Sequence, residues 1–417
     1  MTTLTGAAPE VDSSPLDVEA VRERVAAAAL RPSEVGSVGL ELERHVVDLR
    51  DPGSRVGWDR LTALLEGFAT PRGSKVTLEP GGQVELSTLP GDGVVAAVEA
   101  LRVDANALDA RLAGERLVLQ STGTDPLRAP QRVNPASRYV SMERHFASIG
   151  DTAGPAMMSS TASLQVNLDA GPAHGWADRL AHVHRLLPVF VALAASSPVQ
   201  GGTRTGWACA RQRIWQDLEP GRSRAGTATS DPVAAWTEFA LAAPVMFLRG
   251  GDGQFTAVEG TVSFAAWADG SVRLGDRSPT AADVDAHLTT LWPPVRLRGF
   301  LELRVLDAVP RAWWPGLAAV VATVVDDPTA ADRAAEAAHP VAHAHLEAAR
   351  DGLTDPRIRT AALGVLEAAA ARVPDGLAAD VERWLEALDR GRGPADLVLD
   401  RFERSGPTAC LTAEELR

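Results

Sequence analysis

The chain has 417 residues, 45% of them hydrophobic, and a formal net charge of −13. This composition is typical of a water-soluble globular protein of two or three domains, and the acidic charge argues against nucleic acid as the main partner. The two cysteines give no disulfide framework, the longest apolar segments (186–195 and 317–325) are too short to cross a bilayer, and the N-terminus lacks a secretory signal. We therefore expect a cytoplasmic protein that does not span a membrane.

Helix and strand patterns alternate along the chain. After a disordered leader over residues 1–15, the expected elements are a helix over 17–30, strands and hairpins to about residue 90, a helix over 94–113, strands at 117–123 and 161–169, a helix over 176–195 and a hairpin of 245–248 with 255–258. Beyond residue 315 the chain is alanine-rich with proline and glycine breaks near residues 328, 340, 356 and 374. This pattern predicts a helical C-terminal region.

The segment Gly39-Leu40-Glu41-Leu42-Glu43 sets two carboxylates into an apolar strand. Alternate strand residues face the same side, so Glu41 and Glu43 would lie roughly 6.6 Å apart on one face. Unpaired charges there are costly to desolvate unless a cation compensates them, and hard oxygen ligands favour magnesium or manganese, often together with phosphate. The pattern points to ATP chemistry, although a Glu-x-Glu pair alone also fits the solvated face of an amphipathic strand.

The next acidic segment predicts a hairpin, and the length of its loop decides whether Glu79 and Glu85 face the same side. Residues 75–79 and 83–87 read as strands, and Pro80-Gly81-Gly82 supplies the turn. With all three residues in the loop, Glu79 opposes Gln83 and Glu85 shares the face of Glu79. A two-residue turn would point Glu85 to the other face, so the metal hypothesis requires the longer loop.

Lys75 is the only lysine in the chain. A Walker A loop needs Gly-Lys-Ser/Thr, which does not occur, and the protein-kinase signatures are missing as well. If the protein handles ATP, arginines and metal ions must hold the phosphates, a role that suits the guanidinium fork. A biased genomic composition also explains the scarcity of lysine.

Two further features have structural explanations that we favour over functional ones. His339, His343 and His345 include a pair four residues apart, but no third zinc ligand is identifiable and an exposed helix is the simpler interpretation. The loop Gly201-Gly202-Thr203-Arg204-Thr205-Gly206 has backbone amides that can cradle phosphate, but such loops are usually connections.

Together the motifs resemble those of glutamate-cysteine ligases, with the best match to the plant and actinobacterial branch. The resemblance covers about residues 35–310 in the right order. The matching segments are Gly39-x-Glu41-x-Glu43, Glu79-Pro-Gly-Gly-Gln83-x-Glu85-Leu-Ser87, Met157-Met158 followed by Gln165-Val-Asn167-Leu-Asp169, Ala195-x-Ser197-Pro198, Arg211-x-x-Ile-Trp215, and His287-Leu-Thr-Thr-Leu-Trp-Pro-Pro-Val-Arg296-Leu-Arg298 leading to Leu301-Glu302-Leu303-Arg304.

The resemblance implies an α+β fold: a glutamine-synthetase-like catalytic domain over residues 16–315, in which a curved antiparallel sheet forms a funnel flanked by helices. The helical region over 316–417 would pack on it. The implied reaction joins the γ-carboxylate of L-glutamate to the amine of L-cysteine through γ-glutamyl phosphate, with ATP as co-substrate. In the actinobacterial branch this product feeds ergothioneine synthesis as its first step. No obligate protein partner is indicated.

The resemblance also assigns roles to individual residues, with two or three magnesium ions, replaceable by manganese, bridging phosphate oxygens. It places Glu43, Glu79 and Glu85 on one metal cluster and Glu41 with Glu302 on another. Gln165 stands where other branches have a metal-binding histidine, and its amide oxygen also suits a hard cation. Arg304, on the same strand face as Glu302, would clamp the transferring phosphoryl group. The residues implied to bind substrates or ATP are Gln83, Arg138, Gln165, Asn167, Arg211, Arg213, Arg298 and Arg304.

Two alternatives stay open at this point. A ligase of the same superfamily that uses another amine would share the metal and phosphate residues. A noncatalytic descendant would be expected to lose the metal carboxylates, whereas Glu41, Glu43, Glu79, Glu85 and Glu302 are all present.

Overall fold

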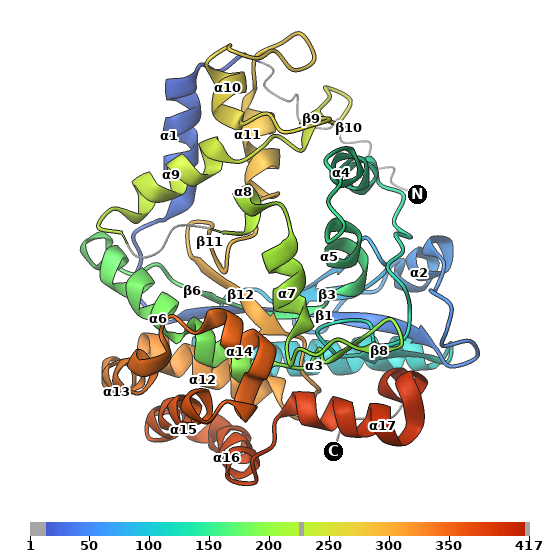
Figure 1. The fold of residues 1–417 in the computed structure, drawn as a ribbon, viewed down its shortest axis with the longest axis vertical. Coiled ribbons are helices and arrows are strands. Elements are labelled where there is room, and N and C mark those ends of the chain that lie inside the picture. The colour runs from blue at the N-terminus through green and yellow to red at the C-terminus, as the bar shows by residue number, and fades with distance from the viewer. Residues whose placement is uncertain (1–13, 225–228, 413–417) are drawn as a thin grey trace.

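The computed structural model describes residues 14–224 and 229–412. Residues 1–13 of the expected leader therefore lie outside the described part of the chain. In Figure 1 a sheet crosses the middle of the molecule, with helices α12 to α17 below it and α4, α5, α7 and α8 above it. Among the described residues no helix is both long and apolar enough to cross a membrane.

The central sheet has eight strands, and the order along its main path is β11-β12-β6-β1-β3-β2. Strands β4 and β5 also pair with β1, and all of the pairings are antiparallel. The strands are β1 (Ser37–Asp48), β2 (Lys75–Leu78), β3 (Val84–Ser87), β4 (Gly91–Asp92), β5 (Leu117–Gln120), β6 (Ser163–Leu168), β11 (Val295–Leu297) and β12 (Leu301–Asp307).

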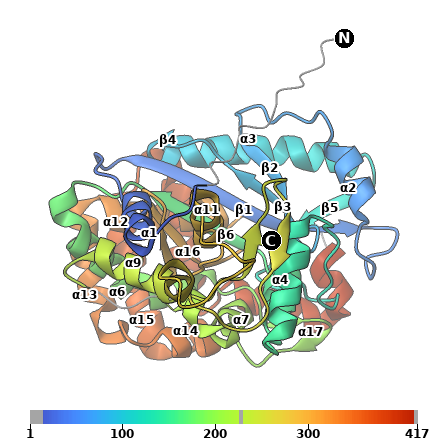
Figure 2. The same ribbon diagram turned by 90° about the horizontal axis from the view of Figure 1, so that it is seen from above.

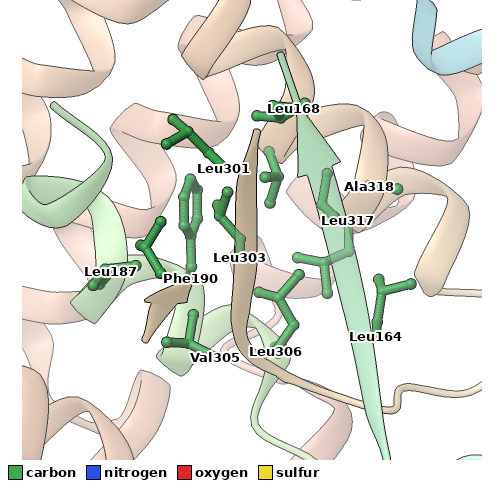
Figure 3. Close-up of a cluster of buried hydrophobic side chains, with 14 of the residues drawn as sticks. Leu164, Leu168, Leu187, Phe190, Leu301, Leu303, Val305, Leu306, Leu317 and Ala318 are labelled. Atoms are coloured by element: carbon green, nitrogen blue, oxygen red, sulfur yellow. The ribbon is translucent and has the colours of Figure 1, made fainter. Parts of the chain in front are cut away.

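One face of the sheet carries the main hydrophobic core. Helices α3 (Gly93–Ala113), α6 (Trp176–Ala194) and α12 (Trp314–Asp326) pack against it. Figure 3 shows Leu164 of β6 and Leu303 of β12 in one buried cluster with Phe190 of α6 and Leu317 of α12. Because side chains alternate along a strand, burial of these leucines turns the polar residues between them to the opposite face.

Helices and a small hairpin surround the opposite, polar face, as Figure 2 shows from above. These elements are α1 (Val18–Ala29), α4 (Ser137–Ser148), α5 (Gly154–Ser160), α7 (Ala210–Asp217), α8 (Pro220–Ser223), α9 (Pro232–Ala242), β9 (Phe247–Arg249), β10 (Phe255–Ala257), α10 (Phe264–Ala268) and α11 (Ala281–Leu288). Two short strands, β7 (Val199–Gln200) and β8 (Thr203–Arg204), form a separate hairpin, and η1 (Ala173–Gly175) precedes α6.

The C-terminal region is helical, as the sequence predicts. Its elements after α12 are α13 (Pro328–Ala338), η2 (His339–Val341), α14 (His345–Asp351), η3 (Gly352–Thr354), α15 (Pro356–Ala370), α16 (Asp375–Asp389) and α17 (Pro394–Thr412). Pro328, Pro356 and Pro394 each open a helix, where the missing amide hydrogen costs nothing. Side chains of α12 and α15 belong to the same hydrophobic cluster as the core of the sheet.

The helices predicted before residue 315 and the hairpin near residue 250 are confirmed with small shifts in their bounds. The expected helices correspond to α1, α3 and α6, and the expected hairpin near residue 250 is β9 with β10. One prediction was wrong: strands do not dominate the whole stretch to residue 90, because Trp58–Leu65 forms α2. This helix has only two turns and buries Leu61 fully, so its apolar periodicity is too short to stand out.

Candidate active site

The hairpin of β2 and β3 has the three-residue loop that the metal hypothesis requires. The backbone amide of Glu79 donates to the carbonyl of Gln83 at 2.8 Å, and that of Gly82 donates to the carbonyl of Glu79 at 2.9 Å. Gly82 takes a φ of +83°, which glycine adopts without strain. The register pairs Thr77 with Glu85, so the prediction that Glu79 and Glu85 share a face is confirmed.

Four glutamates form an acidic wall on one side of a cavity of about 250 Å³: Glu41, Glu43, Glu79 and Glu85. The β1–β3 register sets Glu43 opposite Glu85, which explains how two sequence segments supply one cluster. Each of three of these carboxylates has a hydroxyl or amide donor: Asn167 Nδ2 lies 3.0 Å from Glu41, Ser163 Oγ 2.9 Å from Glu43, and Thr77 Oγ1 2.9 Å from Glu85.

Burial and mutual repulsion raise the pKa values of these four carboxylates. Desolvation, followed by the charges of Glu302 and Glu85, raises the pKa of Glu41 to about 7. Desolvation is also the largest cause that raises the pKa of Glu43, Glu79 and Glu85, and for Glu79 the next causes are the charges of Glu85 and Glu43. These repulsions link all four glutamates, because Glu85 also raises the pKa of Glu41 and Glu41 raises that of Glu43. The division into two metal clusters stays a prediction.

Glu302 differs from these four because arginines already neutralise it. Its carboxylate is fully buried and pairs with Arg296 through two bonds, with Arg298 Nη1 at 2.9 Å and with Arg304 Nη1 at 3.3 Å. These partners hold the pKa of Glu302 well below its usual range despite burial. Glu302 is thus the centre of an arginine wall formed by Arg296, Arg298 and Arg304. The expected pairing of Glu302 with Glu41 on a shared metal stays a prediction.

Arg304 lines the cavity and contacts the neighbouring strand β6. Its Nη1 donates to Gln165 Oε1 at 2.5 Å, and its guanidinium lies 5.9 Å from the ring centre of Trp215. The amide oxygen of Gln165, which the sequence left as a candidate metal ligand, thus accepts from an arginine here.

The remaining residues implied to bind substrates divide into two groups. Arg138, Arg211 and Gln83 line the cavity, and the buried Nε and Nη1 of Arg211 and Oε1 of Gln83 have no hydrogen-bond partner. Asn167 does not line the cavity but donates a hydrogen bond to Glu41, which does. Arg213 does not line the cavity, because its exposed side chain pairs with Asp217 at 3.5 Å.

The comparison with protein families decides what kind of site this is. The family model described as glutamate-cysteine ligase family 2 (GCS2) matches residues 37–414, which include both walls of the cavity. The chain belongs to glutamate-cysteine ligase family 2.

Two bacterial relatives match over nearly their whole length, and a plant relative matches over about half of its length. The chain is 46% identical over 397 residues to the glutamate-cysteine ligase EgtA of Mycolicibacterium smegmatis, covering 94% of this chain and 93% of that protein. It is 45% identical to EgtA of Mycobacterium tuberculosis, covering 98% and 97%. The chloroplastic glutamate-cysteine ligase B of Oryza sativa is 28% identical over 63% of this chain. The family and the recognised branch are therefore confirmed, and this chain is an enzyme of the ligase class.

The fold agrees as well. A crystal structure of glutamate-cysteine ligase from Francisella tularensis in complex with AMP matches with a TM-score of 0.56, although only 13% of residues are identical, and covers 93% of this chain and 91% of that one. The predicted α+β, glutamine-synthetase-like fold class, with its antiparallel sheet and helical C-terminal region, is confirmed.

A metal ion is implied by the family, and the donors at the acidic wall fit it chemically. In the described part of the chain no three or more His, Cys, Asp or Glu side chains stand close enough together to form a ready-made metal cluster. The acidic wall nevertheless offers four hard oxygen donors with raised pKa values, and Gln83 adds a buried amide oxygen without a partner. These are the ligand types that magnesium accepts, and a cation would relieve their repulsion.

Sequence reasoning missed several cavity residues. Arg296 was part of a quoted motif but was given no role, although it lies directly opposite Glu302 in the β11–β12 register and is the largest favourable charge on it. A cross-strand pair of opposite charges is a usable signal once the strands are paired. Further lining residues come from α4, α5 and the loop before β11: Tyr139, Met142, Met157, Met158, Thr289 and Trp292. Met157, Met158, Thr289 and Trp292 stood in quoted motifs without a role, whereas Tyr139 and Met142 stood in none.

The features that the sequence analysis set aside lie outside this cavity. The 201–206 loop belongs to the β7–β8 hairpin and does not line the site. His339 and His343 are exposed, as expected, but His345 is not: it is half-buried, and its Nε2 lies 3.3 Å from Gln212 Oε1. Burial lowers the pKa of His345 to about 4, so its ring is neutral near pH 7.

Proposed function

We propose that this protein joins the γ-carboxylate of L-glutamate to the amine of L-cysteine with ATP, giving γ-glutamylcysteine, ADP and phosphate. The observation that carries the proposal is the cavity itself, which is lined by four glutamates with raised pKa values on one side of strand β6 and by the arginines of β11 and β12 on the other. One wall suits cations and the other suits phosphoryl and carboxylate groups. Identity of 45–46% over nearly the whole chain to two EgtA ligases supports the same substrates.

The reaction needs charge neutralisation and positioning more than a protein nucleophile. An oxygen of the glutamate side chain attacks the terminal phosphorus of ATP, and the bond to the ADP oxygen breaks. The amine of cysteine then attacks the resulting acyl phosphate, and phosphate leaves with the bonding electrons while the amine loses a proton. Arg304 is the residue best placed to meet the phosphoryl group, because it lines the cavity with its guanidinium bonded to Gln165 of the neighbouring strand and 5.9 Å from the ring centre of Trp215.

The other arginines of the cavity fix strand β12 or are candidates to bind substrate carboxylates. Arg296 and Arg298 hold Glu302 and thereby fix the strand that carries Arg304. Arg211 presents two N–H groups without a hydrogen-bond partner, so it is our candidate for a substrate carboxylate. Arg138 lines the same cavity with its guanidinium 5.0 Å from the ring centre of Phe247, and is the second candidate.

We assign metal binding to the acidic wall. Glu41, Glu43, Glu79 and Glu85 would hold two or three magnesium ions, replaceable by manganese, with Gln83 as an additional oxygen donor. When bound, the metal supplies positive charge to the phosphate oxygens of ATP. We further propose that the product enters ergothioneine synthesis, as the resemblance to the actinobacterial branch implies.

The test is direct product analysis. Purified protein with magnesium, ATP, glutamate and cysteine should release phosphate and form γ-glutamylcysteine in equal amounts, measured by colorimetry and mass spectrometry. A panel of other amines should give slower turnover than cysteine. A faster amine would replace cysteine in the proposal, and absence of phosphate release with every amine would favour a noncatalytic descendant of the fold.

A further inference from the structure

Strand β12 is irregular at the residue that matters most for phosphoryl transfer. Leu303 pairs with Val166 and Leu306 with Leu164 of β6, so Arg304 and Val305 together lie opposite Gln165 alone. Such a bulge places an extra residue in one strand and re-aims the neighbouring side chains. Here it accompanies the turn of Arg304 into the cavity while Val305 and Leu306 stay buried in the core.

Two consecutive residues of α7 take up the backbone carbonyls at this bulge. Arg211 Nη2 donates to the carbonyl of Arg304 at 2.9 Å, and Gln212 Nε2 donates to the carbonyl of Val305 at 2.9 Å. His345 of α14 contacts Gln212 Oε1 at 3.3 Å and so leaves the amide nitrogen of Gln212 to face the strand. The first turn of α7 therefore holds the bulge through two side-chain-to-backbone hydrogen bonds, which are separate from the pairing of β6 with β12.

The buried carboxylate of Asp307 lies next to these hydrogen bonds. Asp307 is fully buried, and its Oδ2 accepts from Ser197 Oγ at 2.6 Å and from the backbone amide of Ser196 at 3.0 Å. Its Oδ1 accepts from Cys209 Sγ at 3.2 Å and lies 3.9 Å from Arg211 Nη1.

The surroundings of Asp307 are closely fitted. A Cβ at Gly123 would come within 2.2 Å of the Asp307 carboxyl carbon, so this approach needs glycine. The carboxylate thus joins β12 to the segment that opens α7, and it supplies the negative charge nearest to the buried Arg211 guanidinium.

We propose that Asp307 and Gln212 are positioning residues, which hold Arg304 for phosphoryl transfer through the backbone of the β12 bulge. Asp307 fixes Arg211, Arg211 and Gln212 fix the two carbonyls, and the carbonyls fix the direction of the Arg304 side chain. The proposal rests on the proposed function, because it assigns these residues to the phosphoryl arginine of that site. Neither residue lines the cavity between the acidic wall and the arginine wall, so both act through others.

Two near-isosteric variants separate positioning from folding. In Asp307→Asn the remaining oxygen can keep the bonds from Ser196 and Ser197, while an NH₂ group replaces the oxygen that faces Arg211. Gln212→Met keeps the volume and removes the bond to Val305. We expect kcat to fall by about tenfold or more in each, since a displacement near 1 Å can cost about a hundredfold.

The experiment measures kcat and the KM for ATP, glutamate and cysteine together with the thermal unfolding midpoint. In Gln212→Met all three KM values should stay within twofold, whereas Asp307→Asn should also raise the KM of the substrate carboxylate that Arg211 binds. Cys209→Ala is the matched control: it removes one donor to Asp307 but leaves Asp307 beside Arg211 and keeps the bond from Arg211 to the carbonyl of Arg304, so its kcat should equal that of the wild type.

The outcomes are distinct. A folded Asp307→Asn or Gln212→Met variant with kcat within twofold of the wild type overturns the proposal, and so does a loss that matches the fraction of unfolded protein. If Asp307→Asn does not fold, Gln212→Met decides alone. A wild-type protein that makes no product in the same assay refutes the proposed function, whereas an active wild type with unchanged variants refutes only the positioning role.

Discussion

The acidic wall and the arginine wall line the same cavity but stand in opposite electrostatic states. On the arginine wall, Glu302 has three arginine partners and its pKa lies below the usual range. On the acidic wall the hydrogen-bond donors to Glu41, Glu43 and Glu85 are neutral side chains, and the pKa values of all four glutamates are raised. The arginine wall is internally compensated, whereas the acidic wall needs a cation from outside to ionise fully.

This contrast shows which wall can bind a ligand without losing contacts that it already has. A cation can bind the acidic wall without breaking any ion pair. A phosphoryl group at the arginine wall must instead compete with Glu302 and Gln165 for Arg304. Arg304 has oxygen partners both without substrate and with a phosphoryl group bound, so binding of the phosphoryl group alone gains little free energy. We expect Arg304 to bind the phosphoryl oxygens more strongly only as negative charge develops on them in the transition state.

Removal of a carboxylate from the acidic wall should have the largest effect. Glutamine in Glu43→Gln or Glu85→Gln keeps the shape but loses the charge that holds the metal. Changes in the groups around metal ligands already cost about 10- to 100-fold, so we expect losses in turnover above about a hundredfold without loss of folding. Turnover against magnesium concentration is the measurement, with Glu336→Gln, an exposed residue of α13, as the matched control. Full activity of the wild type in chelator-treated buffer would refute the metal role.

Loss of the Arg304 fork should come next. Arg304→Lys keeps the charge but loses the planar fork, so turnover should fall by about a hundredfold, while the dissociation constant for ATP changes less. Turnover, ATP affinity and thermal stability are measured on the same preparation. Unchanged turnover would exclude a phosphoryl clamp, and a fall in stability alone would make its role structural.

The raised pKa values predict how stability depends on pH in the absence of metal. The pKa of Glu41 is raised from its ordinary 4.5 to about 7, so the folded state binds its proton more tightly than the unfolded chain does. Its stabilising contribution is complete below pH 4.5 and is lost as pH rises through 7. The unfolding midpoint of metal-free protein should therefore drop by about 3 °C between pH 5 and pH 8.

Magnesium should reverse that drop, and more strongly at pH 8 than at pH 5, because it binds the ionised carboxylates. Calorimetric scans at several pH values with and without magnesium test both signs. The variant Glu41→Gln should show a flatter pH dependence, and a midpoint that rises with pH in metal-free wild type would contradict the electrostatics of the acidic wall.

The smallest effect is expected at Arg213. Its side chain is exposed and paired with Asp217 outside the cavity, so Arg213→Lys should leave turnover and all KM values within twofold of the wild type. A tenfold rise in any KM would return Arg213 to the site.

The sequence could predict features that depend on neighbours along the chain. The turn chemistry of Pro80-Gly81-Gly82 predicted the hairpin, which is confirmed, but left two registers open. The structure has the three-residue loop, which puts Glu79 and Glu85 on one face as the metal hypothesis requires. Strand alternation likewise placed Glu41 and Glu43 together, and both line the cavity.

Features that depend on distant segments could not be predicted in this way. Arg211 and Arg213 look equivalent as residues in a motif, but residues two apart on a helix point in nearly opposite directions. Only the presence of α7 shows that Arg211 turns inward and Arg213 outward. The arginine partners of Glu302 likewise required the pairing of β11 with β12.

The central claim is that the two walls activate the glutamate side chain as an acyl phosphate. Glutamate labelled with oxygen-18 in its γ-carboxylate should be incubated with the protein, ATP, magnesium and cysteine, and the released phosphate analysed by mass spectrometry. We predict that each phosphate carries one labelled oxygen, because the attacking carboxylate oxygen stays with phosphorus when the amide forms. Phosphate without label, released together with γ-glutamylcysteine, would contradict the acyl-phosphate route.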